Sequence, residues 1–263
     1  MPAFDPPVAA ASLSGESDAE WARRAAPYVG CAFLGGIALE DATRAAARKL
    51  RERDRTEFLP PDPIAFIDAQ LAALSDVDLR PGMNVRSAAP EPVAAAASVC
   101  ADHGAVLEIN AHCRQAEMCA AGAGETLLAD GDRLCEYVAA AAETGATVSV
   151  KLRAGVAGVD PPALSARLSG AGADLLHVDA MDSEPVVAEI VDAAPDAAVI
   201  ANNGVRDRAT VREYLEYGAD AVSVGRPSDT PAVLARVRTA AREWFDGRTE
   251  RTERTERGAR TDA

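Results

Sequence analysis

The chain has 263 residues, of which 48% are hydrophobic and 26% are charged. This composition is that of an ordinary globular protein, so it excludes a wholly disordered chain and a collagen-like or coiled-coil fibre. A barrel of alternating strands and helices commonly needs about 250 residues, so the length fits one such domain.

The charge balance is unusual, because 41 acidic residues outnumber 27 basic ones and give a formal net charge of −14. Lysine occurs only at Lys49 and Lys151, and the other basic residues are arginine. An acidic, lysine-poor and alanine-rich chain is typical of a protein that stays soluble at high salt, where charge repulsion is screened within about 3 Å at 1 M. We therefore expect a halophilic source. The negative net charge argues against binding of a nucleic acid without excluding it.

The sequence carries no signal for export or membrane insertion. No stretch reaches the roughly 20 consecutive apolar residues of a membrane span, and the N-terminal residues do not form a signal peptide. The cysteines are odd in number and scattered, unlike a secreted disulfide framework. They are Cys31, Cys100, Cys113, Cys119 and Cys135. We expect a protein of the reducing cytoplasm.

Short apolar runs alternate with segments of helical period after a polar start, which we expect to be an N-terminal extension over residues 1–26. This alternation predicts strands and helices around a parallel sheet. The predicted strands are 28–34, a weak one at 57–59, 83–86, 106–110, 147–152, 174–178, 198–201 and 221–224. The predicted helices are 39–53, 90–103, 131–143, 161–170, 184–194, 207–217 and 230–245. The pattern predicts a (β/α)8 TIM barrel, an α/β fold, as a single domain over residues 27–245.

Glycine supports this fold, because it follows four predicted helices and precedes the next strand. These glycines are Gly104, Gly145, Gly172 and Gly218. An open doubly wound sheet is the alternative, and the lack of a Gly-x-Gly-x-x-Gly motif after the first strand disfavours it. The segment from Asp246 repeats Arg-Thr-Glu and is poor in apolar residues. We therefore expect residues 246–263 to be a disordered polar tail.

Polar residues gather at the ends of the predicted strands, where the function of a barrel resides. They are Asn84, Asn110, His112, Cys113, Lys151, Arg153, His177, Asp179, Asn202, Asn203 and Arg226. The last two strand ends are the usual phosphate-binding position, and Gly204, Gly225 and Arg226 offer an approachable backbone and a cation there. The alternative is that both glycines only form turns and that Arg226 is a surface cation.

Lys151 and Cys113 are the two most informative single residues. Lys151 lies inside an apolar run, and a lysine directed into a barrel needs a partner, which a flavin or a substrate anion would provide. The alternatives are that Lys151 pairs with a carboxylate in the core or that its ammonium group reaches the rim of the barrel. Cys113 follows a strand and precedes the flexible segment Gly122-Ala123-Gly124, so it is placed to act as an acid or a nucleophile, although a packed thiol is the commoner state.

Two histidines lie near the same strand ends. His177 is either a hydrogen-bonded core residue or a donor that faces a ligand. The spacing of His112, Cys113 and Cys119 matches no zinc pattern, so we expect no metal site.

Several longer segments follow one another in a characteristic order over roughly residues 83–226. They are Glu108-Ile109-Asn110-Ala111-His112-Cys113, Gly122-Ala123-Gly124-Glu125-Thr126-Leu127-Leu128, Val148-Ser149-Val150-Lys151-Leu152-Arg153-Ala154-Gly155, His177, Val199-Ile200-Ala201-Asn202-Asn203-Gly204-Val205 and Ala219-Asp220-Ala221-Val222-Ser223-Val224-Gly225-Arg226. This combination resembles the tRNA-dihydrouridine synthases, which are flavin-dependent barrel reductases, and in particular a shorter archaeal subgroup of that family.

The resemblance implies an FMN-dependent enzyme that reduces the C5=C6 bond of uracil in tRNA, with NADPH or NADH as the electron donor. Cys113 falls on the family's catalytic cysteine, which protonates C5, and Asn110 and Arg153 would contact the substrate. The implied FMN contacts are Asn84 in place of the family's glutamine, Lys151 and His177 beside the isoalloxazine, and Asn202, Asn203, Gly204, Gly225 and Arg226 at the ribityl phosphate.

Three features depart from the family pattern. Arg114 stands where proline commonly follows the cysteine, and Asp179 stands where an arginine commonly follows the histidine of the sixth strand. The helical domain that grips tRNA is not expected after the eighth helix. These departures leave open an FMN-dependent barrel oxidoreductase that acts on a free pyrimidine, like dihydroorotate dehydrogenases, and a non-catalytic flavin-binding subunit. tRNA is the expected partner.

Overall fold

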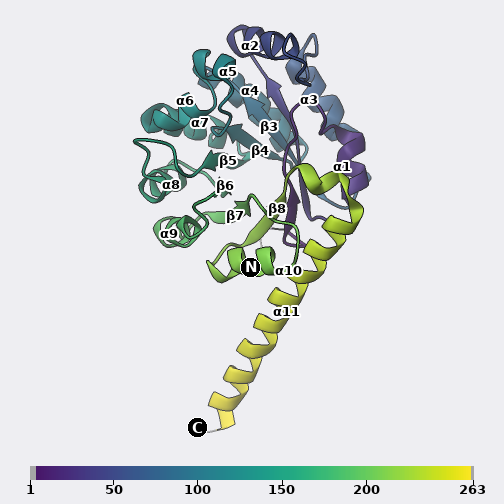
Figure 1. The fold of residues 1–263 in the computed structure, drawn as a ribbon, viewed down its shortest axis with the longest axis vertical. Coiled ribbons are helices and arrows are strands. Elements are labelled where there is room, and N and C mark those ends of the chain that lie inside the picture. Colours follow the sequence, from purple (N-terminus) through teal and green to yellow (C-terminus); the bar gives the residue numbers. More distant parts are fainter. Residues whose placement is uncertain (1–3, 262–263) are drawn as a thin grey trace.

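The computed structural model describes residues 4–261, and it describes side chains for residues 4–247. Eight parallel strands close into a barrel in sequence order, so the predicted (β/α)8 fold is confirmed (Figure 1). The barrel closes because β1 pairs in parallel with both β2 and β8. The strands are β1 (Val8–Ala10), β2 (Cys31–Ala38), β3 (Arg80–Arg86), β4 (Val106–Asn110), β5 (Thr147–Arg153), β6 (Leu175–Asp179), β7 (Ala198–Asn202) and β8 (Ala221–Val224).

Helices surround the barrel, and one of them follows each strand on the outside (Figure 1). They are α1 (Ala19–Ala25), α3 (Pro63–Ala72), α4 (Pro90–Asp102), α7 (Gly131–Ala142), α8 (Pro161–Gly170), α9 (Val186–Ala193), α10 (Arg208–Glu216) and α11 (Pro231–Thr261). Further helices occupy the loops at the carboxyl ends of strands. These are α2 (Asp41–Arg51), α5 (Ala116–Ala120), α6 (Glu125–Ala129) and the 3₁₀ helix η1 (Arg226–Asp229). Within the described residues, no helix has the length and hydropathy that a membrane crossing requires.

The first two strands differ from the prediction. The sequence predicts an extension over residues 1–26, whereas β1 lies within it at Val8–Ala10. Only three residues long, β1 is too short for its apolar pattern to stand out. The weak strand predicted at 57–59 is wrong, because these residues belong to the connection between α2 and α3. Glu57 is buried there because its carboxylate binds Arg86, not because it belongs to the sheet.

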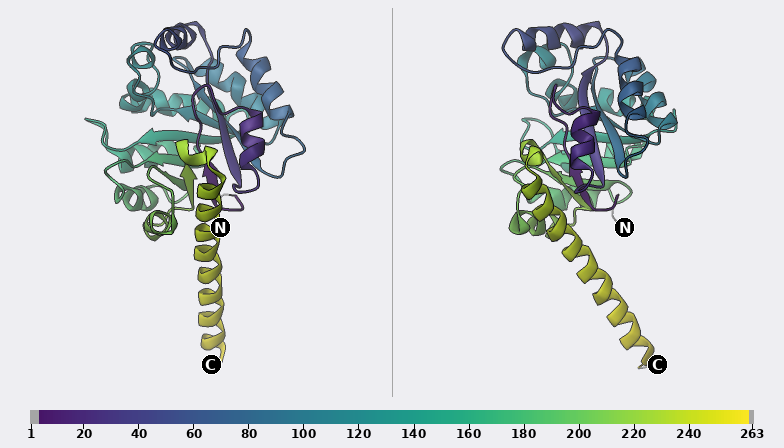
Figure 2. Two further views of the ribbon diagram at one scale, coloured as in Figure 1. Left: turned by 45° about the vertical axis from the view of Figure 1, so that its right-hand side comes forward. Right: turned by 90° about the vertical axis from the view of Figure 1, so that its right-hand side faces the viewer.

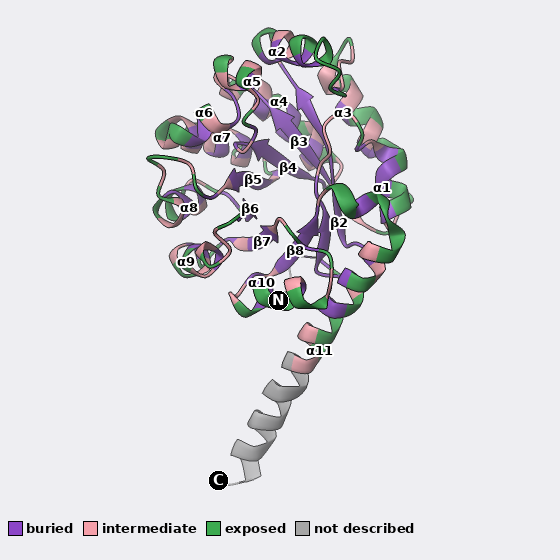
Figure 3. Cartoon of the chain, viewed as in Figure 1, coloured by how far each residue is buried: buried purple, intermediate pink, exposed green. Residues whose placement is uncertain are grey.

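The alternation of side chains along the strands builds the core in layers. Side chains that face outward, such as Ile109 and Val150, pack under the helices. Inside the barrel, a separate apolar cluster that includes Phe33, Val106 and Ile200 fills one layer. The strands are buried along their length and the helices expose their outer faces (Figure 3). Toward the carboxyl ends of β4 to β8, the inward-facing positions that follow this apolar layer are polar. They form the floor of the candidate site described below.

Helix α11 begins after η1 and packs against α10, β1 and β8. In both views of Figure 2 the helix then points away from the barrel. Composition predicts a disordered tail over residues 246–263, whereas the helix continues to Thr261. Arginine and glutamate have high helix propensity, which accounts for this difference. The side chains of residues 248–263 lie outside the described part.

Candidate active site

A cavity of about 510 Å³ opens at the carboxyl ends of the strands. Its volume falls in the range of about 300–1,000 Å³ that is common for small-molecule sites. Two predicted site residues, Asn84 and His177, are not part of its wall and lie fully buried. The other predicted site residues all line the wall. They are Asn110, Cys113, Lys151, Arg153, Asn202, Asn203, Gly204, Gly225 and Arg226.

The register of the strands brings these side chains together. Asn110 pairs with Lys151 across β4 and β5, and Lys151 pairs with His177 across β5 and β6. Asp179 pairs with Asn202 across β6 and β7. Because residues two apart on a strand point to the same side, one polar layer lines the cavity and a second lies beneath it.

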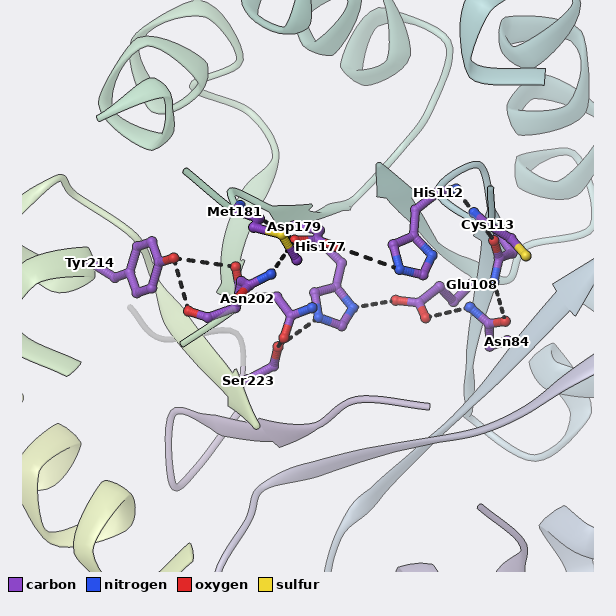
Figure 4. A network of polar contacts seen from close by, with 12 residues as sticks. Asn84, Glu108, His112, Cys113, His177, Asp179, Met181, Asn202, Tyr214 and Ser223 are labelled. Atoms are coloured by element: carbon purple, nitrogen blue, oxygen red, sulfur yellow. Dashed lines mark hydrogen bonds and ion pairs between the residues drawn. The ribbon is translucent and has the colours of Figure 1, made fainter. Parts of the chain in front are cut away.

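A chain of hydrogen bonds crosses the barrel beneath the cavity (Figure 4). Glu108 is at its centre: Oε1 accepts from Asn84 Nδ2 at 2.7 Å, and Oε2 lies 2.6 Å from His177 Nδ1. Nε2 of His177 lies 2.7 Å from Ser223 Oγ, which donates to Asn202 Oδ1 at 2.9 Å. Sequence reasoning gave no role to Glu108 or Ser223. The signal that could have found them is a polar residue at alternating positions of an otherwise apolar strand.

Burial and charge set the pKa values in this layer. Burial alone would raise the pKa of Glu108, but His177, Lys151 and the hydrogen bond from Asn84 together lower it. Glu108 is therefore a carboxylate near neutral pH. Burial lowers the pKa of His177, and the carboxylate of Glu108 opposes this effect. Because a carboxylate can only accept, Nδ1 of His177 donates its N–H to Glu108.

Lys151 reaches the cavity wall from β5 and is only 3% exposed. Burial lowers its pKa, and the carboxylates of Glu108 and Asp179 raise it. Within the described residues, its ammonium group has no hydrogen-bond acceptor. A buried ammonium group with free donors favours a ligand that offers a carbonyl or an anionic group.

The loop that carries Cys113 is held on two sides. Oδ1 of Asn110 accepts from the backbone N–H of Cys113 at 3.0 Å and from that of His112 at 3.3 Å. On the other side, the Cys113 carbonyl accepts from the backbone N–H of Glu125 at 2.8 Å. Gly124 has a φ of 61°, and a Cβ there would collide with this carbonyl, so the close approach requires glycine.

The Cys113 side chain is 9% exposed and packs against apolar residues of β2, α2 and α5. Its sulfur points away from the hydrogen-bonded side chains in Figure 4. The thiol thus lies at the boundary between the cavity wall and an apolar cluster, where the position of its loop decides what it reaches.

His112 and Asp179 are neighbours on the same wall, with Nε2 3.6 Å from Oδ2. The other carboxylate oxygen of Asp179 accepts from Asn203 Nδ2 at 2.8 Å, which fixes the carboxylate. Burial is the main cause that lowers the pKa of His112 well below its usual value, and nearby cations, Lys151 foremost, add to it. The imidazole is therefore neutral near neutral pH.

The ends of β7 and β8 border open space. A Cβ on Gly204 or on Gly225 would meet no protein atom within 4 Å. Asn203 adopts a φ of 97°, and the Tyr214 hydroxyl donates to its carbonyl at 3.0 Å. Arg226 is exposed beside them. This arrangement can receive an anionic group such as a phosphate.

A second part of the wall comes from β3 and the loops after β1 and α2, and it contains a buried ion pair. Arg86 Nη1 donates to Glu57 Oε2 at 2.6 Å, and both side chains are at most 3% exposed. Nη2 of Arg86 donates to Ser14 Oγ, while Nε is buried without a partner among the described residues. Sequence reasoning missed this pair because 29 residues separate its members and neither belongs to a motif.

The cavity wall is positively charged although the chain is acidic. Its cations outnumber its carboxylates six to two. The cations are Arg55, Arg86, Arg114, Lys151, Arg153 and Arg226, and the carboxylates are Glu57 and Asp179. In a chain with a net charge of −14, this local excess favours an anionic ligand.

Comparisons with known proteins match the part of the chain that contains the predicted site residues. A family model described as dihydrouridine synthase matches residues 83–257. An uncharacterized protein of Methanocaldococcus jannaschii is 26% identical over 234 residues, which cover 85% of this chain and 89% of the relative.

Two solved structures show the same fold. DHODH of Eimeria tenella in complex with ferulenol has a TM-score of 0.65 at 14% identity, over 93% of this chain and 82% of that one. Thiamine phosphate pyrophosphorylase of Pyrococcus furiosus has a TM-score of 0.53 at 12% identity, over 90% of this chain and 95% of that one. At these identities the likeness shows the barrel alone.

Proposed function

The chain belongs to the dihydrouridine synthase family and is an FMN-dependent barrel oxidoreductase, and we propose that it reduces the C5=C6 double bond of uracil in tRNA with a nicotinamide electron donor, NADPH or NADH. One observation carries the proposal. The same cavity is lined by Lys151, by an open glycine backbone beside Arg226, and by Cys113. In the described part of the chain, the buried ammonium group of Lys151 has no hydrogen-bond acceptor.

The residues present fit FMN. Gly204 and Gly225 leave space for the ribityl phosphate, and Arg226 supplies a cation next to it. Lys151 offers its ammonium group to the polar edge of the isoalloxazine, and Asn202 and Asn203 offer amide groups at the same end of the barrel. The resemblance also assigns FMN contacts to Asn84 and His177.

These two residues lie one layer below the wall, so we propose a supporting role for them. Asn84 bonds to Asn110, and His177 reaches Asn202 through Ser223. Both thereby hold residues that do line the cavity.

In the proposed reaction the chain binds, orients and protonates the substrate. FMN, when bound and reduced, supplies the hydride that C6 of uracil receives. Cys113 donates its thiol proton to C5, and Asn110 orients the pyrimidine from the end of β4. Arg153 contacts the substrate from the end of β5. Low solvent access at the floor of the cavity strengthens each of these polar contacts.

The cationic wall supports a uridine within RNA over a free pyrimidine. Arg86 is paired with Glu57, and Lys151 and Arg226 are assigned to FMN, which leaves the three wall cations Arg55, Arg114 and Arg153. Free uracil is neutral and would offer these three no anionic partner. The phosphates that flank a uridine in RNA would pair with them, as cationic residues do in nucleic-acid complexes. This local charge also offsets the unfavourable net charge of the whole chain.

The proposal is tested by the dihydrouridine content of tRNA from a strain that lacks this protein. We expect dihydrouridine to be lost at one or more positions, to return with the wild-type gene, and not to return with Cys113→Ala. Unchanged dihydrouridine in the deletion strain would contradict the tRNA substrate. The purified FMN-loaded protein would then be assayed at high salt with uracil, where turnover supports the free-pyrimidine reductase and flavin binding without turnover supports the non-catalytic subunit.

A further inference from the structure

A carboxylate in the barrel core is linked to the Cys113 loop by two amide side chains. Glu108 Oε1 accepts from Asn84 Nδ2 at 2.7 Å, and Asn84 Oδ1 accepts from Asn110 Nδ2 at 2.9 Å. Asn110 Oδ1 then accepts from the backbone N–H of Cys113 at 3.0 Å. The three side chains are buried, at 4% exposure or less.

Because Glu108 is a carboxylate, it fixes the direction of every hydrogen bond in this series. A carboxylate can only accept, so Asn84 must turn its NH₂ group toward Glu108. The oxygen of Asn84 then faces Asn110, which must present its own NH₂ group in turn. The oxygen of Asn110 is thereby left for the backbone N–H groups of the loop.

We propose that Glu108 is a positioning residue that sets the place of the Cys113 thiol through Asn84 and Asn110. This inference rests on the proposed function for the role of the thiol, but the structural link itself does not depend on it. His177 holds the second oxygen of Glu108 at 2.6 Å, so the same carboxylate ties the loop to the opposite side of the barrel.

The position of the loop can be measured without any enzymatic activity. Cys113 is only 9% exposed and part of its surroundings is an apolar cluster, so the rate at which its sulfur is alkylated reports how firmly the loop holds it there. The experiment treats the FMN-loaded full chain at high salt with iodoacetamide and follows each cysteine by peptide mass spectrometry. Cys135 on α7 serves as the internal reference.

Glu108→Leu keeps the bulk of the side chain and removes both acceptors. We expect alkylation of Cys113 to become about tenfold faster, the change that corresponds to loss of one buried hydrogen bond. Glu108→Gln should stay close to wild type. Its amide oxygen can accept from Asn84 while its NH₂ group donates to Nδ1 of His177, whose proton can move to Nε2.

Asn84→Ala is a second variant that breaks the same path and leaves the Glu108–His177 contact in place, so it covers the case in which Glu108→Leu does not fold. Ser149→Ala is the matched control, because Ser149 bonds to Glu108 at 3.3 Å but does not lead to the loop. We expect faster alkylation of Cys113 in Asn84→Ala and wild-type rates in Ser149→Ala.

A second readout follows turnover. Glu108→Leu and Asn84→Ala should lower the rate of substrate reduction more than the rate at which the nicotinamide donor reduces the flavin. Glu108→Gln should restore the former. The inference is overturned if neither variant accelerates the alkylation of Cys113, if Cys135 accelerates equally, or if Glu108→Gln behaves like Glu108→Leu. A protein that reduces no tRNA but shows the expected alkylation pattern overturns only the proposed function.

Discussion

The cavity wall has two parts that use polar residues differently. The part from β4 to β8 carries Lys151, Cys113 and the glycine ends of β7 and β8. The Lys151 ammonium group has no hydrogen-bond acceptor among the residues that the structure describes. The part that includes β3 carries Arg86, which is bound to Glu57 and Ser14. The first part has donors left over for a ligand, whereas the charge of Arg86 in the second part is paired with Glu57 within the protein.

This difference separates a ligand-binding surface, the β4–β8 part, from a structural ion pair, Arg86 with Glu57. A buried cation with free donors is costly unless a ligand completes its contacts, so such a group marks a binding surface. A buried ion pair has its charges neutralised, and breaking it leaves one of them uncompensated. We therefore expect substitutions in the β4–β8 part to change chemistry and substitutions of the ion pair to change stability.

The largest effect is expected for Cys113→Ala. Loss of a general acid typically slows a reaction by about 10²- to 10⁴-fold, so substrate reduction should fall by that order. Flavin content and reduction of the flavin by the nicotinamide donor should persist, because the thiol has no proposed role in either. The measurement combines turnover of unmodified tRNA with the flavin absorbance spectrum.

Cys119→Ala is the matched control for this experiment. Cys119 lies six residues further along the chain, with its sulfur 3.5 Å from the Cys113 carbonyl, and it has no proposed chemistry. Equal losses in the two variants, or a loss in Cys113→Ala that follows release of flavin or unfolding, would remove the acid role.

The next largest effect concerns the ion pair of Arg86 with Glu57. Glu57→Ala leaves the buried Arg86 guanidinium without its carboxylate, and we expect the free energy of unfolding to fall by about 3–5 kcal/mol. Urea unfolding at high salt measures this change. Asp132→Ala breaks the pair of Arg167 with an Asp132 side chain that is 92% exposed, and it should cost less than about 1 kcal/mol. Similar losses in both variants would contradict the distinction between the two parts of the wall.

The two parts also differ in how well the sequence predicts them. Strands β4 to β8 each contain apolar residues in a strand pattern, and polar residues at their ends line the cavity, so Lys151, Asn202 and Cys113 could be placed from the pattern. Strand β1 has only three residues, and its neighbours give no periodic signal. The pair of Arg86 with Glu57 depends on a connection folding back onto the barrel, which no local pattern encodes.

Depth within the barrel is a further property that the sequence did not reveal. His177 and Lys151 are paired residues of adjacent strands, yet Lys151 lines the cavity and His177 lies beneath it. Strand tilt in a closed barrel places paired residues at different heights. A strand-end motif therefore identifies the side chains of a site but not which of them reach its surface.

A smaller effect is expected at the phosphate end of the β4–β8 part. Arg226→Ala should weaken FMN binding by about 1–3 kcal/mol, the range for loss of one charge-assisted hydrogen bond. The dissociation constant is measured by quenching of flavin fluorescence. Arg206→Ala is the control, because Arg206 bonds to the Gly204 carbonyl and lies near Asp207 but is not part of the cavity wall. Unchanged affinity in Arg226→Ala would make Arg226 a surface cation.

The smallest effect is a pH dependence of stability that originates at His112. The folded chain lowers the pKa of this imidazole well below 6.5, so below about pH 6.5 the unfolded chain binds a proton that the folded chain does not. The free energy of unfolding therefore falls as the pH falls, by at most about 1.4 kcal/mol per pH unit for one such group. Above this range both states are neutral and the contribution vanishes.

His112→Asn should flatten this slope, which urea unfolding at several pH values between neutral and mildly acidic conditions would show. The slope should not reach zero, because burial lowers the pKa of His177 in the same direction. His103→Asn is the control, since His103 pairs with Asp68 at 2.8 Å and is not part of the cavity wall. His112→Asn could instead keep the wild-type dependence of unfolding free energy on pH while His103→Asn loses it. The β4–β8 part would then not hold a neutral imidazole beside Lys151, and its electrostatic difference from the Arg86–Glu57 pair would be contradicted.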